Sequence, residues 1–125
     1  MKTSVNALHH LNNDWLKELT FYKDELKVLQ NRLGEVATKN TSQEVLAQVE
    51  HFQNRFIILN QQADNLKHDV NKLNDHLNAL ASDNPEHTHQ KSLPEAEGLQ
   101  TRVAGYAKEF SEIRFELNMF LSKVM

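Results

Sequence analysis

Histidine is the residue type with the widest chemistry in this chain, because neutral imidazole binds transition metals and titrates near neutral pH. Seven histidines occur among 125 residues. In the helix arrangement predicted below, six of them lie at one end of the molecule, at heights similar to several aspartates. Imidazole and carboxylate together form a ligand set for Zn, Ni or Cu. The candidate metal ligands are His9, His10, His68, His76, His87 and His89.

Two other interpretations of these histidines stay open. His10 and His68 occupy outward heptad positions, and the other two helical candidates flank the core stripe, which is typical of solvated polar residues. Helical di-iron sites use inward Glu-x-x-His pairs, and the only such spacing here is Glu86 to His89, in a predicted loop. The solvated interpretation is favoured over a metal site. A pH-sensitive end with several titrating imidazoles is the third alternative.

Carboxylates are the second group with possible chemistry. Four glutamates flank the predicted core stripes, namely Glu18, Glu25, Glu109 and Glu116. Paired carboxylates perform acid–base chemistry only in a cleft that shifts their pKa values. We expect ion pairs that fix the register instead, with Glu116 reaching Lys23 and Arg55 lying level with Glu25. No glycine-rich phosphate loop, nucleotide fingerprint or Ser/His/Asp arrangement is present, so the sequence predicts a protein that is not an enzyme.

Composition narrows the class of protein further. Cysteine is absent, which excludes disulfides and thiolate metal sites. The net charge is −3, and the lysines and arginines are scattered among acids, so we expect no nucleic-acid partner. No run of 18 consecutive apolar residues occurs, and the first twenty residues lack the apolar run of a signal peptide. The sequence therefore predicts a cytoplasmic protein with no membrane contact.

Three long helices are predicted to position all of these residues. Apolar residues recur at alternating steps of three and four, which is the a/d stripe of helices packed side by side. Asn12 is the only polar non-aromatic residue on the stripes. The stripes are Val5, Leu8, Asn12, Trp15, Leu19, Tyr22, Leu26, Leu29, Leu33 and Val36; Val45, Val49, Phe52, Phe56, Leu59, Ala63, Leu66, Val70, Leu73, Leu77 and Leu80; and Leu99, Val103, Tyr106, Phe110, Ile113, Leu117, Phe120 and Val124.

Breaks between the stripes set the helix bounds. The segments 41–44 and 92–95 have the pattern of capping boxes, and Pro94 would then lie in a first turn, where its missing N–H costs little. Helices are predicted near 4–38, 42–81 and 93–125, with a loop over 82–92. Short connections make neighbouring helices antiparallel. The prediction is an all-α protein, an antiparallel up-down-up three-helix bundle with long coiled-coil-like helices, forming one domain over 1–125.

The predicted loops also fix which residues lie level with one another. On that register Trp15 faces Ala63 and Ile113, and a second layer contains Tyr22, Phe56 and Phe120. A three-helix rod with the Trp15-Leu16 pattern on its first stripe resembles spectrin-type repeats. The resemblance implies a helical rod, and the chain departs from the pattern because its third helix has no second tryptophan.

Apolar residues also occur off the stripes, at positions that face outward in an isolated bundle. On the predicted register five of them share one height: Phe21, Ile57, Ile58, Phe115 and Met119. Leu16 and Leu121 are expected to widen the core nearby. A belt of exposed apolar residues indicates a contact surface, most simply a two-fold homodimer. Because three helices point in three directions, we expect the first and third helices to supply the interface, with the helix 2 residues partly buried.

These observations predict a non-enzymatic interaction or scaffolding bundle that self-associates or binds a helical protein partner through this belt. The alternative is a His-rich bundle that binds a metal such as Zn, Ni or Cu, or senses metal or pH, through the six histidines named above.

Overall fold

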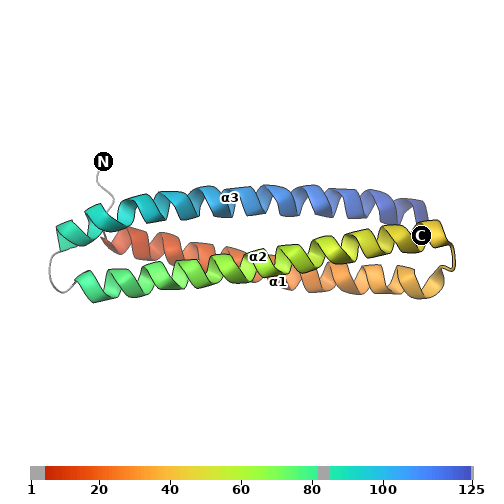
Figure 1. Cartoon of the computed structure of the whole chain (residues 1–125), viewed down its shortest axis with the longest axis horizontal. Helices are drawn as coiled ribbons and strands as arrows, with labels where there is room; N and C mark the ends of the chain where they lie inside the picture. Colours follow the sequence, from red (N-terminus) through yellow and green to blue (C-terminus); the bar gives the residue numbers. More distant parts are fainter. Residues whose placement is uncertain (1–4, 82–84, 125) are drawn as a thin grey trace.

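Three long helices account for nearly all of the chain in a computed structural model, which describes residues 5–81 and 85–124, and side chains over 5–78 and 92–124. Helix α1 spans Val5–Lys39, α2 spans Gln43–Ala81 and α3 spans Pro85–Val124. They lie side by side as one elongated rod (Figure 1). The predicted all-α three-helix bundle is confirmed, and the described ranges contain no strand.

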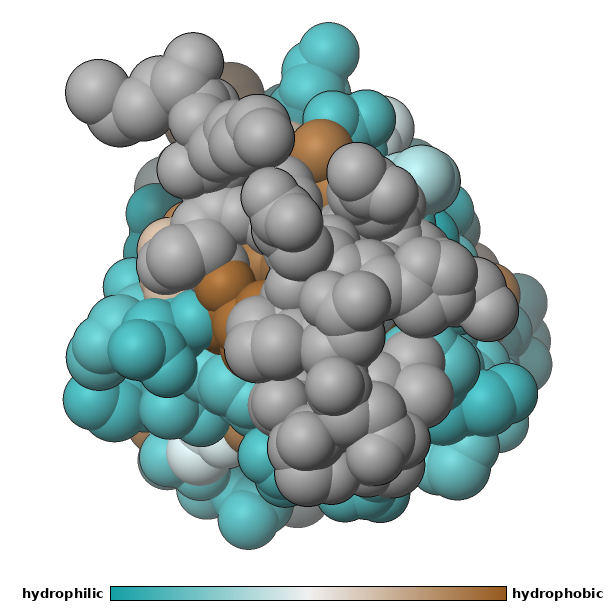
Figure 2. All heavy atoms as spheres, turned by 90° about the vertical axis from the view of Figure 1, so that its left-hand side faces the viewer, coloured by the Kyte–Doolittle hydropathy of each residue, from teal (hydrophilic) through white to brown (hydrophobic). Residues whose placement is uncertain are grey.

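The core is the set of a/d stripes, as the periodicity predicted. Large apolar residues such as Leu19, Phe56, Phe110 and Leu117 are almost fully buried between the helices. Each contributes roughly 1.5–3 kcal/mol to stability by leaving water. Outside the stripes, Leu121 is buried and Leu16 is partly buried, so they widen the core as expected. Viewed from one end, polar side chains cover most of the described periphery, and apolar atoms show between the helices (Figure 2).

Contacts between side chains give the direction of the helices. Asn12 bonds to Asn74, and farther along α1 Lys23 pairs with Asp64. The residue number of the α2 partner therefore decreases as the residue number on α1 increases. Helix α2 therefore runs opposite to α1. Likewise Asp69 binds Arg102 whereas Phe52 meets Phe120, so α3 runs opposite to α2. Figure 1 shows the same path along the rod.

These contacts correct the register predicted from the loops. Trp15 lies between Asn12, which bonds to Asn74, and Thr20, which bonds to Lys67. Its level on α2 is therefore between residues 67 and 74 rather than at Ala63, although Trp15 and Ala63 are both buried.

The predicted layer of Tyr22 with Phe120 is also wrong. Tyr22 packs against Tyr106 and Phe110, with ring centroids 5.5 and 4.7 Å apart, whereas Phe120 packs against Phe52 at 5.4 Å. Phe120 lies ten to fourteen residues beyond the partners of Tyr22, roughly 15–21 Å along α3. Most of the error lies between α1 and α2, because Lys23 pairs with Asp64, nine residues along α2 from the level that the Trp15–Ala63 register gives it. The register of α3 against α2 differs by only four residues, since Phe120 meets Phe52 rather than Phe56.

Helix α3 begins at Pro85, not near residue 93. Proline suits the first helical position because its missing N–H has no intrahelical partner there. Pro94 is consequently inside the helix, and the capping box predicted at 92–95 does not form. Ser92 and Ala96 are buried and continue the a/d stripe of α3 from Leu99 back to residue 92, so Ser92 is a core position rather than a cap. Both are small, so the stripe was not recognised as apolar before Leu99.

The turn between α1 and α2 is capped at both helix ends. Asn40 donates its side-chain amide to the Val36 carbonyl at 2.8 Å, which satisfies an orphan acceptor of α1. The Val45 amide donates to Ser42 Oγ at 3.5 Å, so Ser42 caps α2. The predicted cap was one residue earlier. In the described part of the chain, no helix has the length and apolarity needed to cross a bilayer.

Candidate interaction surface

Of the histidines predicted as metal ligands, His68 lies apart from His9 along the rod. His9 is half-buried, and its Nδ1 lies 3.1 Å from Asn74 Oδ1. His68 lies level with Leu19, because the neighbouring pair Thr20 and Lys67 is in contact. That places His68 ten residues along α1 from His9, about 15 Å away. The common height predicted for these two histidines is therefore wrong.

The remaining candidate ligands do not complete a site either. His10 and His76 are exposed, and His76 lines the groove between α2 and α3. Among residues with described side chains, no three histidines or acids lie close enough together to hold a metal ion. His87 and His89 fall outside those residues, so their part of the prediction remains untested.

A small polar cluster of Asn12, His9 and Asn74 lies at this end of the rod. Asn12 is fully buried and donates its amide nitrogen to Asn74 Oδ1 at 2.8 Å. His9 approaches the same oxygen, so one acceptor on α2 joins two side chains of α1. Asn12 Oδ1 is buried and has no hydrogen-bond partner among the described atoms. The cluster ties α1 to α2 and fixes their stagger, as expected for a buried asparagine.

The ion pairs among the described residues use other carboxylates than the glutamates expected. Lys23 pairs with Asp64 rather than Glu116, and Arg102 Nη1 lies 2.8 Å from Asp69 Oδ2. Both pairs are partly exposed, and pairs of this kind contribute roughly 0–1 kcal/mol. Their main effect is on the relative position of the helices, because each pair joins two neighbouring helices.

Tyrosines near the middle of the rod have shifted acidities. Burial, together with smaller effects of the neighbouring Tyr22, Asp64 and Glu109, raises the pKa of Tyr106 to about 12. Burial and a 3.0 Å hydrogen bond to Glu18 Oε1 likewise raise the pKa of Tyr22. Both shifts keep the phenols neutral, so these tyrosines act as packing groups.

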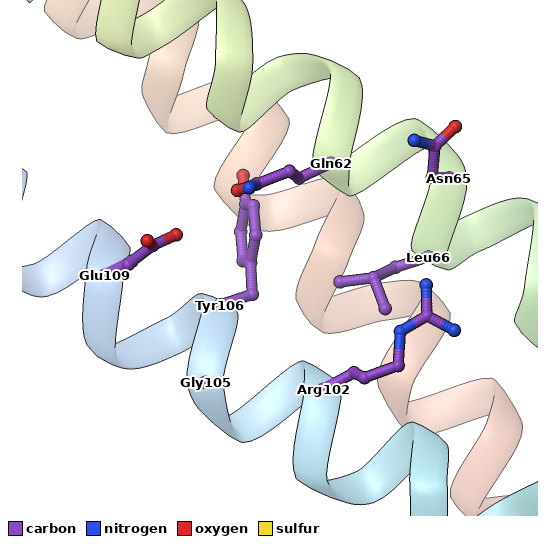
Figure 3. Close-up of a pocket in the computed structure, with 7 residues that line it drawn as sticks. All are labelled: Gln62, Asn65, Leu66, Arg102, Gly105, Tyr106 and Glu109. Carbon is purple, nitrogen blue, oxygen red and sulfur yellow. The ribbon is translucent and has the colours of Figure 1, made fainter.

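Depressions lie along the groove where α2 meets α3. One of about 440 Å³ is shown in Figure 3, lined by Gln62, Asn65, Leu66, Arg102, Gly105, Tyr106 and Glu109. In that view Arg102 and Glu109 lie on either side of Gly105, and the ring of Tyr106 rises toward Gln62. A second depression, of about 350 Å³, shares Arg102 and continues past Gly98 toward Glu95.

Two glycines, Gly98 and Gly105, line this groove. The sequence-based prediction did not use them. A Cβ atom added to Gly98 or Gly105 would meet no neighbouring atom within 4 Å, so neither glycine is required by close packing. They are seven residues apart and share one heptad position. Glycine inside a helix lowers helix stability by about 1 kcal/mol relative to alanine. Two glycines at the same heptad position could therefore have indicated a groove on α3.

The five residues predicted as an interface are all exposed, yet they do not share one level. Phe115 is level with Ile57, because Phe120 meets Phe52 five residues away on each helix. Phe21 is level with Leu66, because Lys23 pairs with Asp64 two residues away. Phe21 thus lies nine residues from the level of Ile57, roughly 13 Å along the rod. Its predicted height is wrong.

Val28, rather than Phe21, lies at this level. It is five residues after Lys23, so it is level with Leu59, five residues before Asp64. We define the apolar belt as five residues from all three helices, each 45–66 % exposed: Val28, Ile57, Ile58, Phe115 and Met119. The partial burial expected for Ile57 and Ile58 is wrong, because both are exposed.

Two grooves adjoin the belt on different sides of the rod. Phe115 and Met119 border a depression of about 540 Å³ between α2 and α3, whose apolar lining includes Phe52 and Phe120. Ile57 borders a depression of about 620 Å³ between α1 and α2. The belt therefore surrounds the rod rather than forming a single flat patch, and its role as an interface remains a prediction.

Comparison with protein-family models, with curated proteins and with solved structures finds no match to this chain.

Proposed function

We propose that this chain is a non-enzymatic interaction module, a helical rod that binds protein through apolar side chains on its outer surface. The observation that carries the proposal is the apolar belt, whose five members are 45–66 % exposed at one level of the rod. Burying one such side chain is worth roughly 1.5–3 kcal/mol. A partner that covers neighbouring members, such as Phe115 with Met119, gains free energy on binding, which is why contiguous exposed apolar residues mark interaction sites.

The grooves beside the belt favour a helical partner. An amphipathic helix binds by laying its apolar face into a groove between two helices. Phe52 and Phe120 provide an apolar floor in the α2–α3 groove, and Phe115 and Met119 stand at its rim. Glu44 and Lys123 line the same groove, so the rim also offers charges of both signs.

Site-specific photocrosslinking tests this proposal. A photoreactive phenylalanine analogue is placed at Phe115 or, as the matched control, at Lys108, in cells that make the chain at its natural level. The two positions are exposed and seven residues apart on the same face of α3, and only Phe115 belongs to the belt. We expect a discrete crosslinked protein, either a second copy or another chain, from Phe115 and not from Lys108.

Equal crosslinking at the two positions, or none at Phe115, would contradict the proposal. Circular dichroism of both labelled chains checks that the helices are intact, so that a negative result is not caused by unfolding.

A further inference from the structure

We propose that the partner of the α2 part of the belt, Ile57 and Ile58, is a second copy of this chain, which binds antiparallel along the outer face of α2 about a two-fold axis at Ile58. The inference rests on the proposed function and names the partner and the face. Ile57 and Ile58 are 52 % and 45 % exposed, and they lie at the centre of this face.

Helix α2 carries a second stripe on the side opposite its core stripe. Every residue at alternating steps of three and four from Glu44 to Lys72 is exposed. Between His51 and His68 this outer stripe contains only Asn54, Ile58, Gln61 and Asn65, none of which is charged. Outer faces of helices are ordinarily rich in charge. The uncharged middle of the outer stripe, with its exposed isoleucine, resembles the core of a protein interface. The charged ends of the stripe resemble the polar rim of such an interface.

The order of residues along the outer stripe is self-complementary. Ile58 lies midway between Glu44 and Lys72, fourteen residues from each. In an antiparallel contact centred on Ile58, Glu44 of one copy lies opposite Lys72 of the other, and the two-fold axis repeats this pair at the far end. The stripe therefore supplies two ion pairs of opposite charge, one at each end of the contact.

Inner pairs of the outer stripe match in the same way. His51 and Asn65 each lie seven residues from Ile58, so they face each other across the axis. Asn54 and Gln61 lie four and three residues from it, so two amides that both donate and accept hydrogen bonds come together. Ile58 meets its own copy at the axis, which buries apolar surface at the centre of the contact.

A parallel dimer would not have this complementarity. It would place Glu44 beside Glu44 and Lys72 beside Lys72, and like charges at these distances repel. The antiparallel contact also has a like-charged pair beside the outer stripe, Glu50 opposite Asp64, which the two-fold axis repeats. Asp64 already pairs with Lys23 of its own chain, which offsets that repulsion.

Charge reversal tests the two end pairs directly. Glu44→Lys and Lys72→Glu each replace two attractive pairs with two repulsive ones, and we expect each to raise the dimer Kd roughly tenfold at low salt. The double variant restores both pairs with reversed polarity, so its Kd should return to within about threefold of wild type. Within one chain the two residues are 28 positions apart, roughly 42 Å along the helix, so they cannot rescue each other internally.

The measurement is sedimentation equilibrium over a range of protein concentration at low ionic strength. Ile58→Glu, which places two carboxylates at the axis, should leave only monomer over that range. Lys108→Glu is the matched control for Lys72→Glu, because it makes the same charge change on α3, away from the outer stripe, and should leave the dimer unchanged. Circular dichroism confirms that all variants stay helical.

The antiparallel contact is wrong if the double variant dimerises as weakly as the single variants. It is also wrong if the wild-type chain is a monomer. Neither result removes the proposed function if Phe115 still crosslinks to a different protein. Conversely, rescue by the double variant establishes self-association through α2 even if the crosslinking experiment finds no other partner.

Discussion

Asn12 is buried on the a/d stripe of α1, and its position explains why the helices adopt one stagger. Its amide bonds to Asn74 at 2.8 Å, and His9 meets the same acceptor. Sliding α1 by one turn would leave these buried polar groups without partners, which costs about 1–3 kcal/mol for each group. The register role of Asn12 was predictable from the sequence. Asn74 was not, because it lies beside the stripe of α2 and nothing in its spacing distinguishes it from other polar residues.

Tyr106 provides a pH-dependent prediction at the same scale. Its pKa is raised to about 12, chiefly by burial, from an ordinary value of 10. As the pH rises above 10 the unfolded chain loses this proton first, so the folded state binds more protons and the free energy of unfolding falls. The loss is complete only above the folded pKa and amounts to about 2–3 kcal/mol, because one pKa unit corresponds to about 1.4 kcal/mol.

The variant Tyr106→Phe should remove most of this alkaline loss and leave the smaller share from Tyr22. At neutral pH we expect a change within about 1 kcal/mol, since the hydroxyl is buried with no hydrogen-bond partner among the described atoms. Urea unfolding at pH 7 and near pH 11 measures both effects. An alkaline decline as steep as that of wild type would show that Tyr106 titrates normally.

Helix α3 shows how a local capping pattern can be overridden by packing. The segment 92–95 has the residues of a helix start, and the sequence-based prediction began the helix there. In the structure the helix continues back to Pro85, and Ser92 is buried on its a/d stripe together with Ala96, so Ser92 is a core position rather than a cap. Small residues on a stripe carry little hydrophobic signal, and for this reason the extension was not predictable from periodicity alone.

Pro94 distinguishes the two helix starts experimentally. Inside a helix a proline removes one backbone hydrogen bond and clashes with the preceding turn, at a cost of about 3 kcal/mol. Pro94 is exposed, so alanine there loses little packing. The variant Pro94→Ala should therefore stabilise the chain by up to about 3 kcal/mol in urea unfolding.

If α3 instead began near residue 93, Pro94 would occupy a first turn, where proline is favourable. The same variant would then be neutral or slightly destabilising. Leu93→Ala is a useful companion, because Leu93 packs against the core and its truncation should destabilise the chain whichever start is correct.

For the whole molecule, three helices and their core faces were predictable because strict periodicity over many turns has few structural explanations. Relative heights were not. They were inferred from the loops alone, whereas side-chain contacts such as Asn12 with Asn74 set the stagger of α1 against α2. The belt shows the consequence. Its residues on α2 and α3 share a level as predicted, whereas Phe21 of α1 lies about 13 Å away and Val28 replaces it.

The register of α1 against α2 can be measured with engineered cysteines, because the natural chain has none. Lys67 Nζ lies 3.2 Å from Thr20 Oγ1, so cysteines at 20 and 67 should crosslink rapidly with a short bismaleimide. The register expected from the loops would instead place Thr20 level with Ile57. That residue is ten positions from Lys67, about 15 Å along α2. Cysteines at 20 and 57 should therefore react slowly within one chain, and the reverse order of rates would rule out the stagger set by Asn12 and Asn74.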